Sequence, residues 1–384
     1  MFTRTLKKRK KLILVSNQAF SLVNFRGELI KDLIDSGISV VALAPDHDER
    51  SRRLLAELGA THSDYKLDRT GIGLLSDFAT LLQLYTIFKK EKPDAILSYF
   101  MKPVIYGSIT ARLSGVTKIF SLVAGLGYTF SSNEDSFTVR QILLRAFATT
   151  LYRIAFTCCD KVFFQNKEDI DEMVQARCLP RSKAVCLSGT GVNLDTLRPR
   201  PMPCGPITFL LMARLLKQKG IREFAAAAEI LKSQGRSCRF LLLGGLDPNP
   251  NGLSENEVLA WVENGTLEWQ GHVNNVLPFV EQSHVFVLPS YYREGVPRSA
   301  QEAMALGRPV ITTDNVGCRE TVIDGVTGFM VPPRNVEALV EAMKCFIDEP
   351  ELIETMGFRS RELVERKFDV RKVNATILRN IANI

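Results

Sequence analysis

Two glutamates flank a Gly-Val-Pro turn in the second half of this 384-residue chain. Glu294 and Glu302 lie eight positions apart within PSYYREGVPRSAQEAM, residues 289–304. The apolar run ending at Leu288 predicts a strand, and Pro297 suits the first turn of a helix. Glu294 is therefore expected in the loop after a strand, and Glu302 on the next helix. Carboxylates only accept hydrogen bonds, so this pair suits a ligand with two groups of hydroxyls, such as a nucleotide sugar; an ordinary surface pair would show the same spacing.

Two cations precede a second predicted helix. In FLLMARLLKQKG, residues 209–220, a strand pattern is followed by Arg214 and Lys219, and Gly220 opens the helix. A helix amino terminus offers free N–H groups and a partial positive charge, so cations beside it favour a diphosphate. If these two cations neutralise the diphosphate, no metal ion and no other cofactor is expected.

Further motifs follow in a fixed order through the second half. They read FLLLGG at 240–245, HVFVLPS at 284–290 and GRPVITTDNVGCRETVIDGVTGFMVPP at 307–333. Over about 160 residues this series resembles the carboxyl-terminal domain of family 4 retaining glycosyltransferases, which have the GT-B fold. The resemblance implies a UDP-sugar as the donor substrate.

The resemblance also implies a role for each donor-site residue. Glu302 would accept hydrogen bonds from the ribose hydroxyls, and Glu294 from those of the sugar. The predicted catalytic residues are Glu294, Arg214 and Lys219, the two cations binding the phosphates. Backbone N–H groups around Gly295 and Val296 would help to hold the sugar and diphosphate. Retention then needs no protein nucleophile, although a covalent role for Glu294 stays open chemically.

Candidate ligand-binding segments also follow the strands predicted in the first half. SNQAFSLVNFRGE, residues 16–28, is interpreted as a loop leading into a helix, where Gly27 could let the backbone approach a phosphate or simply suit close packing. Segments after two later strands are expected to face a cleft between domains. They supply the acceptor-site candidates Lys102, Gly125, Gly127 and Tyr128.

Together with FFQNKEDI (163–170) and LSGTGVNLD (187–195), these segments resemble one bacterial branch of family 4. Its members extend undecaprenyl-diphosphate-linked sugars with hexoses or N-acetylhexosamines in N-glycan, capsule and O-antigen assembly. A lipid-linked saccharide is therefore the implied acceptor. The chain departs from the pattern at Ala124, where the branch often has Thr, and at Lys102, near which many family members have His.

Apolar strand patterns alternate with amphipathic helix patterns throughout the chain, which predicts an α/β protein with parallel sheets. Four prolines between Leu197 and Pro206 indicate a linker between two Rossmann-like domains of the GT-B fold. The predicted organisation is an acceptor-binding domain at 1–197, a linker at 198–206, a nucleotide-sugar-binding domain at 207–368, and a helix at 369–384 that returns to the first domain. Predicted strands of the first domain are Leu12–Ser16, Val40–Ala44, Ala95–Ser98, Ile119–Val123 and Val162–Gln165.

Charge is concentrated in the first half. Residues 1–200 carry 29 Lys and Arg against 20 Asp and Glu, a net +9, whereas the remainder carries −2 and the whole chain +7. This asymmetry suggests an anionic partner, and nucleic acid is disfavoured because no binding motif accompanies the basic residues. TVRQILLRAFATTLYRIAF, residues 138–156, interrupts an apolar helix pattern with Arg140, Arg145 and Arg153. That pattern is typical of helices on an anionic membrane surface, and also of a core helix with a few exposed arginines.

The chain is therefore expected in the cytoplasm, peripherally bound to the inner face of the membrane. No export signal is recognised, and its eight cysteines lack paired spacing, which favours reduced thiols. Asp46-His47-Asp48 imitates the metal-binding motif of the other glycosyltransferase fold and is interpreted as a turn. A nucleotide-sugar epimerase, a phosphorylase and a non-catalytic nucleotide-sugar-binding subunit stay open as alternatives. The sequence does not determine the oligomeric state.

Overall fold

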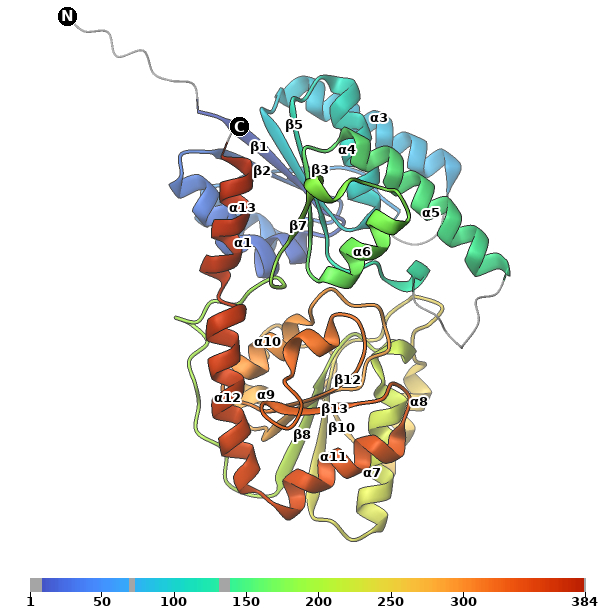
Figure 1. Cartoon of the computed structure of the whole chain (residues 1–384), viewed down its shortest axis with the longest axis vertical. Helices are drawn as coiled ribbons and strands as arrows, with labels where there is room; N and C mark the ends of the chain where they lie inside the picture. Colours follow the sequence, from blue (N-terminus) through green and yellow to red (C-terminus); the bar gives the residue numbers. More distant parts are fainter. Residues whose placement is uncertain (1–8, 69–72, 131–138, 383–384) are drawn as a thin grey trace, which may run out of the picture. The chain divides into compact units, whose positions relative to one another are not determined.

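The computed structural model describes residues 9–68, 73–130 and 139–382, apart from the side chains of Leu74, Tyr128 and Arg140. The chain divides into two compact units (Figure 1). The first comprises Met1–Leu187 and Lys372–Ile384, and the second comprises Ser188–Arg371. The chain therefore passes from one unit to the other twice.

The first unit is built on a parallel sheet with the order β3-β2-β1-β4-β5-β6-β7 among its described strands. These strands are β1 (Lys11–Val15), β2 (Ser39–Ala44), β3 (Thr61–Asp64), β4 (Ala95–Tyr99), β5 (Lys118–Val123), β6 (Lys161–Phe164) and β7 (Ala184–Cys186). Its helices are α1 (Ala19–Asp35), α2 (Glu49–Glu57), α3 (Leu74–Glu91), α4 (Met101–Ser114), α5 (Val139–Cys158), α6 (Lys167–Gln175) and α13 (Val370–Ile381), with 3-10 turns η1 (Tyr128–Phe130) and η2 (Arg181–Lys183).

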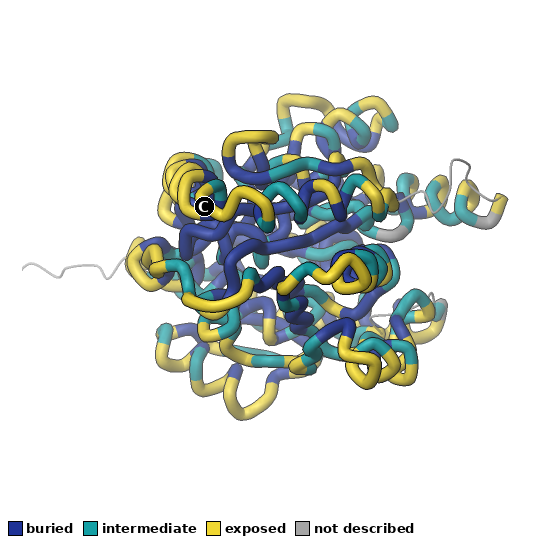
Figure 2. Tube along the Cα trace, turned by 90° about the horizontal axis from the view of Figure 1, so that it is seen from below, coloured by how far each residue is buried: buried dark blue, intermediate teal, exposed yellow. Residues whose placement is uncertain are grey.

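Both faces of this sheet are buried, which explains the continuous apolar runs of its central strands. Successive side chains of a strand point to opposite faces. Ile13 and Val15 of β1 accordingly pack in the core with α3, α4, α5 and α6, whereas Leu12 and Leu14 pack with α1, α2 and α13. Figure 2 shows the resulting buried strands between helices that are exposed on their outer sides.

The second unit repeats this arrangement with the strand order β10-β9-β8-β11-β12-β13, again parallel throughout its described pairs. The strands are β8 (Ile207–Met212), β9 (Cys238–Leu243), β10 (Glu268–Trp269), β11 (Val285–Leu288), β12 (Val310–Thr313) and β13 (Gly328–Val331). The helices are α7 (Ile221–Ser233), α8 (Glu255–Glu263), α9 (Leu277–Glu281), α10 (Arg298–Ala305), α11 (Val336–Asp348) and α12 (Glu351–Lys367), with 3-10 turns η3 (Lys217–Lys219) and η4 (Cys318–Thr321).

These two parallel sheets confirm the predicted fold class, and the five strands predicted for the first unit agree with the structure to within one residue at each end. The edge strands β3 and β7 were not predicted. β3 reads THSD and is only partly buried, so it lacks the apolar run that marks a central strand.

The units divide ten residues before the predicted boundary at residue 197. Residues 188–197 belong to the second unit, where Val192 bridges to Asp369 and Leu194 joins the core. The predicted linker at 198–206 is also held to this unit. The buried Arg308 guanidinium donates to the carbonyls of Arg200 at 2.7 Å and Pro201 at 3.0 Å. A proline-rich composition marked irregular backbone here, while buried hydrogen bonds decided to which unit it belongs.

Candidate functional site

The order of strands in the second sheet reverses between β8 and β11, because the chain adds β9 and β10 on one side of this pair and β12 and β13 on the other. These neighbouring strands are followed by α7 and α10, which pack with opposite sides of β8: Phe209 and Leu211 lie in the core with α7, and Leu210 and Met212 with α10. Parallel sheets bind ligands outside the carboxyl ends of strands at such a switch point. Arg214 and Lys219 follow β8, and Glu294 follows β11, so all three lie at this edge.

Lys219 and Glu294 form an ion pair at the switch point. Lys219 Nζ contacts Glu294 Oε1, and both side chains are nearly nine-tenths buried. The Ser290 hydroxyl donates to the same Glu294 oxygen at 3.0 Å. The backbone N–H groups of Tyr291 and Tyr292 donate to the Gln218 carbonyl at 2.9 and 3.0 Å. Backbone hydrogen bonds therefore join the lysine-bearing turn to the glutamate-bearing loop.

Two glycines permit this close approach of the loops. Gly220 has φ +76°, and a Cβ there would lie 2.1 Å from the Pro289 carbonyl oxygen. Gly317 has φ +79°, and a Cβ there would lie 1.7 Å from the Gly295 carbonyl oxygen. Any larger residue at either position would push the backbone away from the Glu294 loop, because both glycines combine positive φ with backbone contact.

Aromatic and thiol groups line the same ion pair. Lys219 Nζ lies 5.4 Å from the centre of the Tyr292 ring, within cation–π range. Burial, together with the negative charge of Glu294, raises the pKa of the Cys318 thiol to about 12. Cys318 is therefore neutral at physiological pH and acts here as a packing residue.

The second predicted glutamate, Glu302, is paired with a different cation, Arg298. It lies on α10, where Arg298 Nε donates to Glu302 Oε1 at 2.9 Å across one helical turn. Arg298 Nη1 also donates to the Gly191 carbonyl at 3.0 Å. The Gln301 amide oxygen accepts from Gly191 N–H at 3.1 Å. The turn Gly189–Gly191 is thereby held against the start of α10, and the Glu302 carboxylate is held by Arg298.

Arg214 lies at the same edge with a different partner. Its Nη1 donates to Asp247 Oδ2 at 2.8 Å, and its side chain is 57% exposed. Asp247 follows β9, which neighbours β8. Among the described residues, Lys219 is paired with Glu294 and Arg214 with Asp247. The two predicted phosphate-binding cations therefore belong to separate ion pairs.

Gly295 and Val296 connect Glu294 to α10. Both residues are buried, and the Val296 side chain packs in the core beneath the loop. The Val296 carbonyl accepts from the Gln301 amide at 3.2 Å. The valine side chain and this hydrogen bond therefore anchor the turn between Glu294 and α10. The role of Gly295 and Val296 toward a donor stays a prediction.

The first unit corrects the expectation for Gly27. The helix α1 begins at Ala19, so Gly27 lies inside it and not in a loop. A Cβ at Gly27 would meet only Leu58 Cδ1, at 3.7 Å, which is an ordinary packing contact. Helical backbone is occupied by its own hydrogen bonds, so Gly27 does not offer the open backbone that a phosphate loop needs.

Lys102 makes a buried ion pair within the first unit. It is the second residue of α4, after β4, and its Nζ contacts Asp77 Oδ1 of α3 at 2.8 Å. The same ammonium donates to the Asp68 carbonyl at 2.8 Å. These contacts tie α4 to α3 and to the segment before α3, so Lys102 has a structural task in this unit.

The remaining acceptor candidates lie after β5. Gly125 and Gly127 adopt positive φ angles of 96° and 68°, and the Gly127 carbonyl accepts from Phe130 N–H at 3.1 Å to close the turn η1. Tyr128 is in this turn, but its side chain lies outside the described residues. The segment leaves the carboxyl end of its strand as predicted, and its contact with an acceptor stays a prediction.

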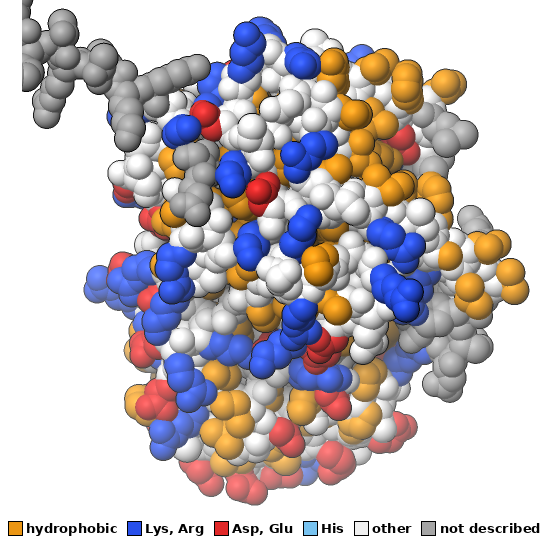
Figure 3. Space-filling view, turned by 45° about the horizontal axis from the view of Figure 1, so that its top comes forward, with side chains coloured by type: hydrophobic (Ala, Val, Ile, Leu, Met, Phe, Trp, Pro, Cys, Tyr) orange, Lys and Arg blue, Asp and Glu red, His pale blue; other side chains and the backbone are white. Residues whose placement is uncertain are grey.

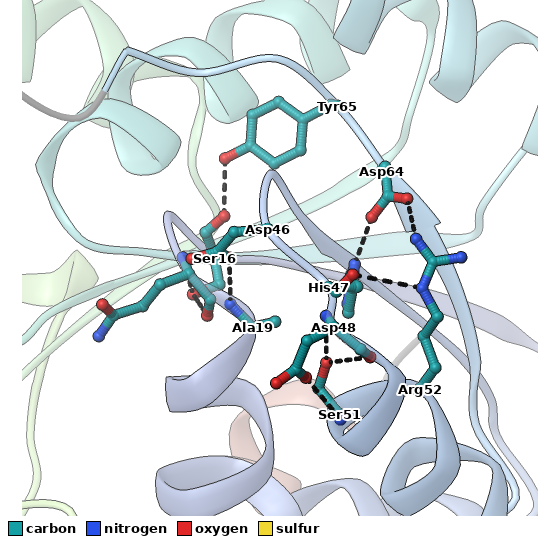
Figure 4. Close-up of polar contacts among 10 residues, drawn as sticks. Ser16, Ala19, Asp46, His47, Asp48, Ser51, Arg52, Asp64 and Tyr65 are labelled. Carbon is teal, nitrogen blue, oxygen red and sulfur yellow. Dashed lines mark hydrogen bonds and ion pairs between the residues drawn. The ribbon is translucent and has the colours of Figure 1, made fainter.

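Both aspartates of the Asp46-His47-Asp48 turn serve helix amino termini (Figure 4). Asp46 Oδ1 accepts from Ala19 N–H at 2.6 Å at the start of α1, and Asp48 Oδ1 accepts from Ser51 N–H at 2.8 Å in α2. His47 Nδ1 lies 2.7 Å from Asp64 Oδ1. These caps explain the acidic residues by local structure, in line with the interpretation as a turn.

The arginines predicted for a membrane surface also have partners. Arg145 Nη2 contacts Glu172 Oε1 at 2.5 Å, and Arg153 donates to the Ala176 and Arg177 carbonyls at 2.8 and 3.1 Å. Both therefore join α5 to α6 and the residues after it. The Arg140 side chain lies outside the described residues.

Three contributors to the site were missed from the sequence. Arg298 and Ser290 each stand four residues before a predicted glutamate, and in α10 that spacing places Arg298 beside Glu302. The spacing could have identified Arg298. Gln301 carries no such signal, because its partner Gly191 is distant in sequence.

Two family profiles match the chain. The profile described as "Glycosyl transferase 4-like" matches residues 11–166, and the profile described as "Glycosyl transferases group 1" matches residues 206–349. Each match covers most of one unit, and the second contains the whole switch-point site. The profiles confirm the family that the order of motifs predicted.

Curated bacterial glycosyltransferases are similar to the chain over most of their length. A Campylobacter jejuni N,N'-diacetylbacillosaminyl-diphospho-undecaprenol α-1,3-N-acetylgalactosaminyltransferase is 26% identical over 88% of this chain and 89% of its own. A Staphylococcus aureus capsular polysaccharide biosynthesis glycosyltransferase is 27% identical over 77% and 78%. An Escherichia coli UDP-Gal:α-D-GlcNAc-diphosphoundecaprenol α-1,3-galactosyltransferase is 25% identical over 78% of each chain.

Solved structures agree on the fold. A sucrose-phosphate synthase from Thermosynechococcus elongatus superposes with a TM-score of 0.77 at 20% identity, covering 98% of this chain and 99% of its own. HepE from Anabaena, in complex with UDP, superposes with a TM-score of 0.75 at 15% identity, covering 98% and 100%. The two-sheet architecture is therefore that of GT-B glycosyltransferases.

Proposed function

This chain belongs to the group 1, GT4-like glycosyltransferases, and from that premise we propose that it transfers a hexose or N-acetylhexosamine with retention from a UDP-sugar to an undecaprenyl-diphosphate-linked saccharide. The single observation that supports UDP-sugar as the donor is the Lys219–Glu294 pair at the switch point of the second sheet. It combines a cation for phosphate with a fixed carboxylate for hydroxyls. The proposed lipid-linked acceptor is supported by the substrates in the names of two relatives.

In the proposed donor complex the ion pairs open toward the substrate. Lys219 moves from Glu294 to the diphosphate, and Glu294 exchanges its lysine for hydroxyls of the sugar. Arg214 is two-fifths buried and can swing from Asp247 to the same diphosphate. Glu302, steadied by Arg298, accepts from the ribose hydroxyls. A charged hydrogen-bond acceptor typically contributes about 1.5–3 kcal/mol to such a contact.

The proposed chemistry places the cations on the leaving group. The bond between the anomeric carbon and the diphosphate oxygen breaks, and that oxygen gains negative charge. An acceptor hydroxyl attacks the same face of the sugar, and its proton passes to the departing phosphate oxygen. Lys219 and Arg214 stabilise the developing charge in the transition state, an effect worth about 3–4 kcal/mol for one preorganised donor.

The proposed lipid-linked acceptor supports a location of the enzyme at the inner face of the cytoplasmic membrane. No helix in the described part of the chain is both long and apolar enough to span a bilayer. The first unit supplies the acceptor candidates Gly125, Gly127 and Tyr128, and its net positive charge suits an anionic lipid surface. Surface polysaccharide or glycan assembly is the proposed pathway class.

The test combines a donor panel with a transfer assay. Thermal melting with UDP-, GDP- and ADP-sugars identifies the nucleotide, because a ligand that binds the folded state raises the melting temperature with concentration. Transfer of label from the identified UDP-sugar to a bacterial lipid extract then measures activity. We expect UDP release only when the lipid acceptor is present.

Other outcomes separate the alternatives. An epimerase would convert the UDP-sugar without acceptor, and a non-catalytic subunit would bind it without turnover. A melting temperature that responds only to a GDP- or ADP-sugar would contradict the proposed donor. Unchanged transfer in both the Arg214→Ala and Glu294→Ala variants would contradict the proposed site.

A further inference from the structure

The outer side of α3 is apolar where a surface helix is ordinarily polar. Asp77, Thr80, Leu84 and Phe88 face the protein, and the opposite stripe, at helical spacing, is exposed. Leu75 is 88% exposed, Phe78 59% and Leu82 53%, and Tyr85 is also exposed. Within the described part of the chain these side chains stay exposed, and a stripe of this kind is typical of a surface that contacts a partner or a lipid phase.

A second apolar stripe follows α5. Exposed residues recur at helical spacing along it: Val139, Ile142, Leu143, Phe147 and Ile154. Helix α4 lies between α3 and α5, because it contacts both, and its Leu113 is 67% exposed. In Figure 3, hydrophobic side chains gather over the part of the molecule where Figure 1 places α3 and α5.

Among the described residues of α3, α4 and α5, the exposed charged side chains are basic. Lys89 and Lys90 are exposed in the last turn of α3, with Lys89 Nζ 5.6 Å from the Tyr85 ring centre. The sequences of α4 and α5 contain no Asp or Glu. The two acidic residues of α3 are engaged, Asp77 with Lys102 and Glu91 with Lys11. Basic groups beside exposed apolar groups are typical of surfaces that bind anionic bilayers.

A shallow groove of about 430 Å³ runs along α5 beside its stripe. It is lined by Ile142, Ala146, Thr149 and Thr150, with Arg145 and Arg153 among them. Arg145 is paired with Glu172, whereas Arg153 donates to backbone carbonyls, so those contacts leave the positive charge of Arg153 uncompensated beside the groove. A guanidinium held in this way suits a lipid phosphate that lies against it.

We infer that the outer faces of α3 and α5 form a docking surface for an anionic lipid bilayer, into which Leu75, Phe78, Leu82, Leu143 and Phe147 insert. The inference deepens the proposed function, since a lipid-linked acceptor requires the enzyme to work at a membrane. A second copy of the chain is the disfavoured occupant. A twofold contact would bring this basic face of one copy against the same face of another, and α4 and α5 contribute no acidic residue to compensate.

The test uses flotation of the full chain with vesicles and without donor or acceptor. Vesicles of phosphatidylcholine with about 30 mol% phosphatidylglycerol should carry the protein upward, and pure phosphatidylcholine vesicles should carry much less of it. The Leu75→Ser, Phe78→Ser, Leu82→Ser variant should lose binding by about tenfold or more. The matched control, Leu259→Ser, Val262→Ser, Phe358→Ser, removes three exposed apolar residues from the second unit and should float like the parent chain.

Three results would overturn the docking surface. They are unchanged flotation of the α3 variant, no flotation of the parent chain, and a dimer in sedimentation velocity that the α3 variant converts to a monomer. Should the serine variant fail to fold, Lys89→Glu with Lys90→Glu tests the same surface by reversing its charge. Sugar transfer in detergent is measured separately. An α3 variant that still transfers sugar in detergent but no longer floats supports the docking surface. A parent chain that floats but transfers no sugar refutes only the proposed function.

Discussion

Each unit carries a lysine–carboxylate pair after a strand at the switch point of its sheet. In the second unit Lys219 pairs with Glu294, with 13% and 11% of the side chains exposed. In the first unit Lys102 pairs with Asp77, with 16% and 11% exposed. The strand order around the two switch points is also alike. Topology and burial therefore do not distinguish a ligand site from a structural tie.

What differs is how each pair is built into its surroundings. Asp77 comes from a helix, and Lys102 also donates to a backbone carbonyl, so the pair locks α3 to α4. Glu294 comes from a loop held by Ser290, and the Lys219 turn is held to that loop by backbone hydrogen bonds. The second pair can open toward a ligand while its loops stay joined. The first pair cannot open without detaching two elements.

The largest expected effect comes from the second unit. Lys219→Met should lower the transfer rate by about a hundredfold or more, because one preorganised donor contributes about 3–4 kcal/mol to a developing oxyanion. The lipid-transfer assay with saturating UDP-sugar measures it. Lys344→Met is the matched control, since Lys344 pairs with Glu341 on the surface of α11. Equal rates for the two variants would remove Lys219 from the site.

Lys102 should behave in the opposite way. Lys102→Met leaves Asp77 buried without its cation and should lower the free energy of unfolding by about 1–3 kcal/mol, with the remaining solvent contact keeping the loss moderate. Urea denaturation measures this, with Lys31→Met of the exposed Lys31–Asp35 pair as the control. If Lys102→Met instead abolishes transfer at unchanged stability, Lys102 belongs to the acceptor site and the comparison between the pairs fails.

Glu302 should affect nucleotide binding. Glu302→Gln keeps the shape of the side chain and removes its charge, so UDP affinity should fall by about tenfold, the effect of losing about 1.4 kcal/mol of a charged hydrogen bond. Isothermal calorimetry measures the change. Glu365→Gln is the control, because Arg361 and Glu365 form the same type of i,i+4 pair on α12. A normal UDP affinity for Glu302→Gln would leave the carboxylate without a donor role.

The smallest effect is a pH dependence of stability. Burial lowers the pKa of His284 below its ordinary value of 6.5, and the ring accepts from Thr208 N–H and lies 3.0 Å from the Pro203 carbonyl. The unfolded chain then binds more protons at this residue than the folded protein does. His284 therefore stabilises the fold fully above pH 6.5, and this contribution is lost as pH falls.

Urea denaturation between pH 8 and pH 5.5 checks this sign. The free energy of unfolding should decrease toward low pH, and His284→Gln should make that decrease smaller. Burial also lowers the pKa of His62 in the first unit, so His62→Gln provides the comparison between units. A parent chain whose stability rises toward low pH would contradict the assignment of both histidines as groups with a lowered pKa in the folded protein.

The central strands, the fold class and the chemistry of the second half were predictable because they depend on short sequence patterns. Apolar runs identified β1, β4 and β8, and motif order identified the glycosyltransferase domain. The start of α1 was missed because SNQAF resembles a loop when its capping partner Asp46 is not known. The outward apolar side of α3 was missed because helical periodicity is the same whichever side faces the core.

The sequence by itself determined which groups are available: a lysine before a helix, a glutamate after a strand, and a basic first half. Only the tertiary structure decided that Lys219 meets Glu294, that Lys102 is held by Asp77, and which side of α3 reaches solvent. Local patterns depend on neighbours within a turn or a strand. Partners, by contrast, are chosen by packing of segments distant in the chain, such as the approach that Gly220 and Gly317 permit.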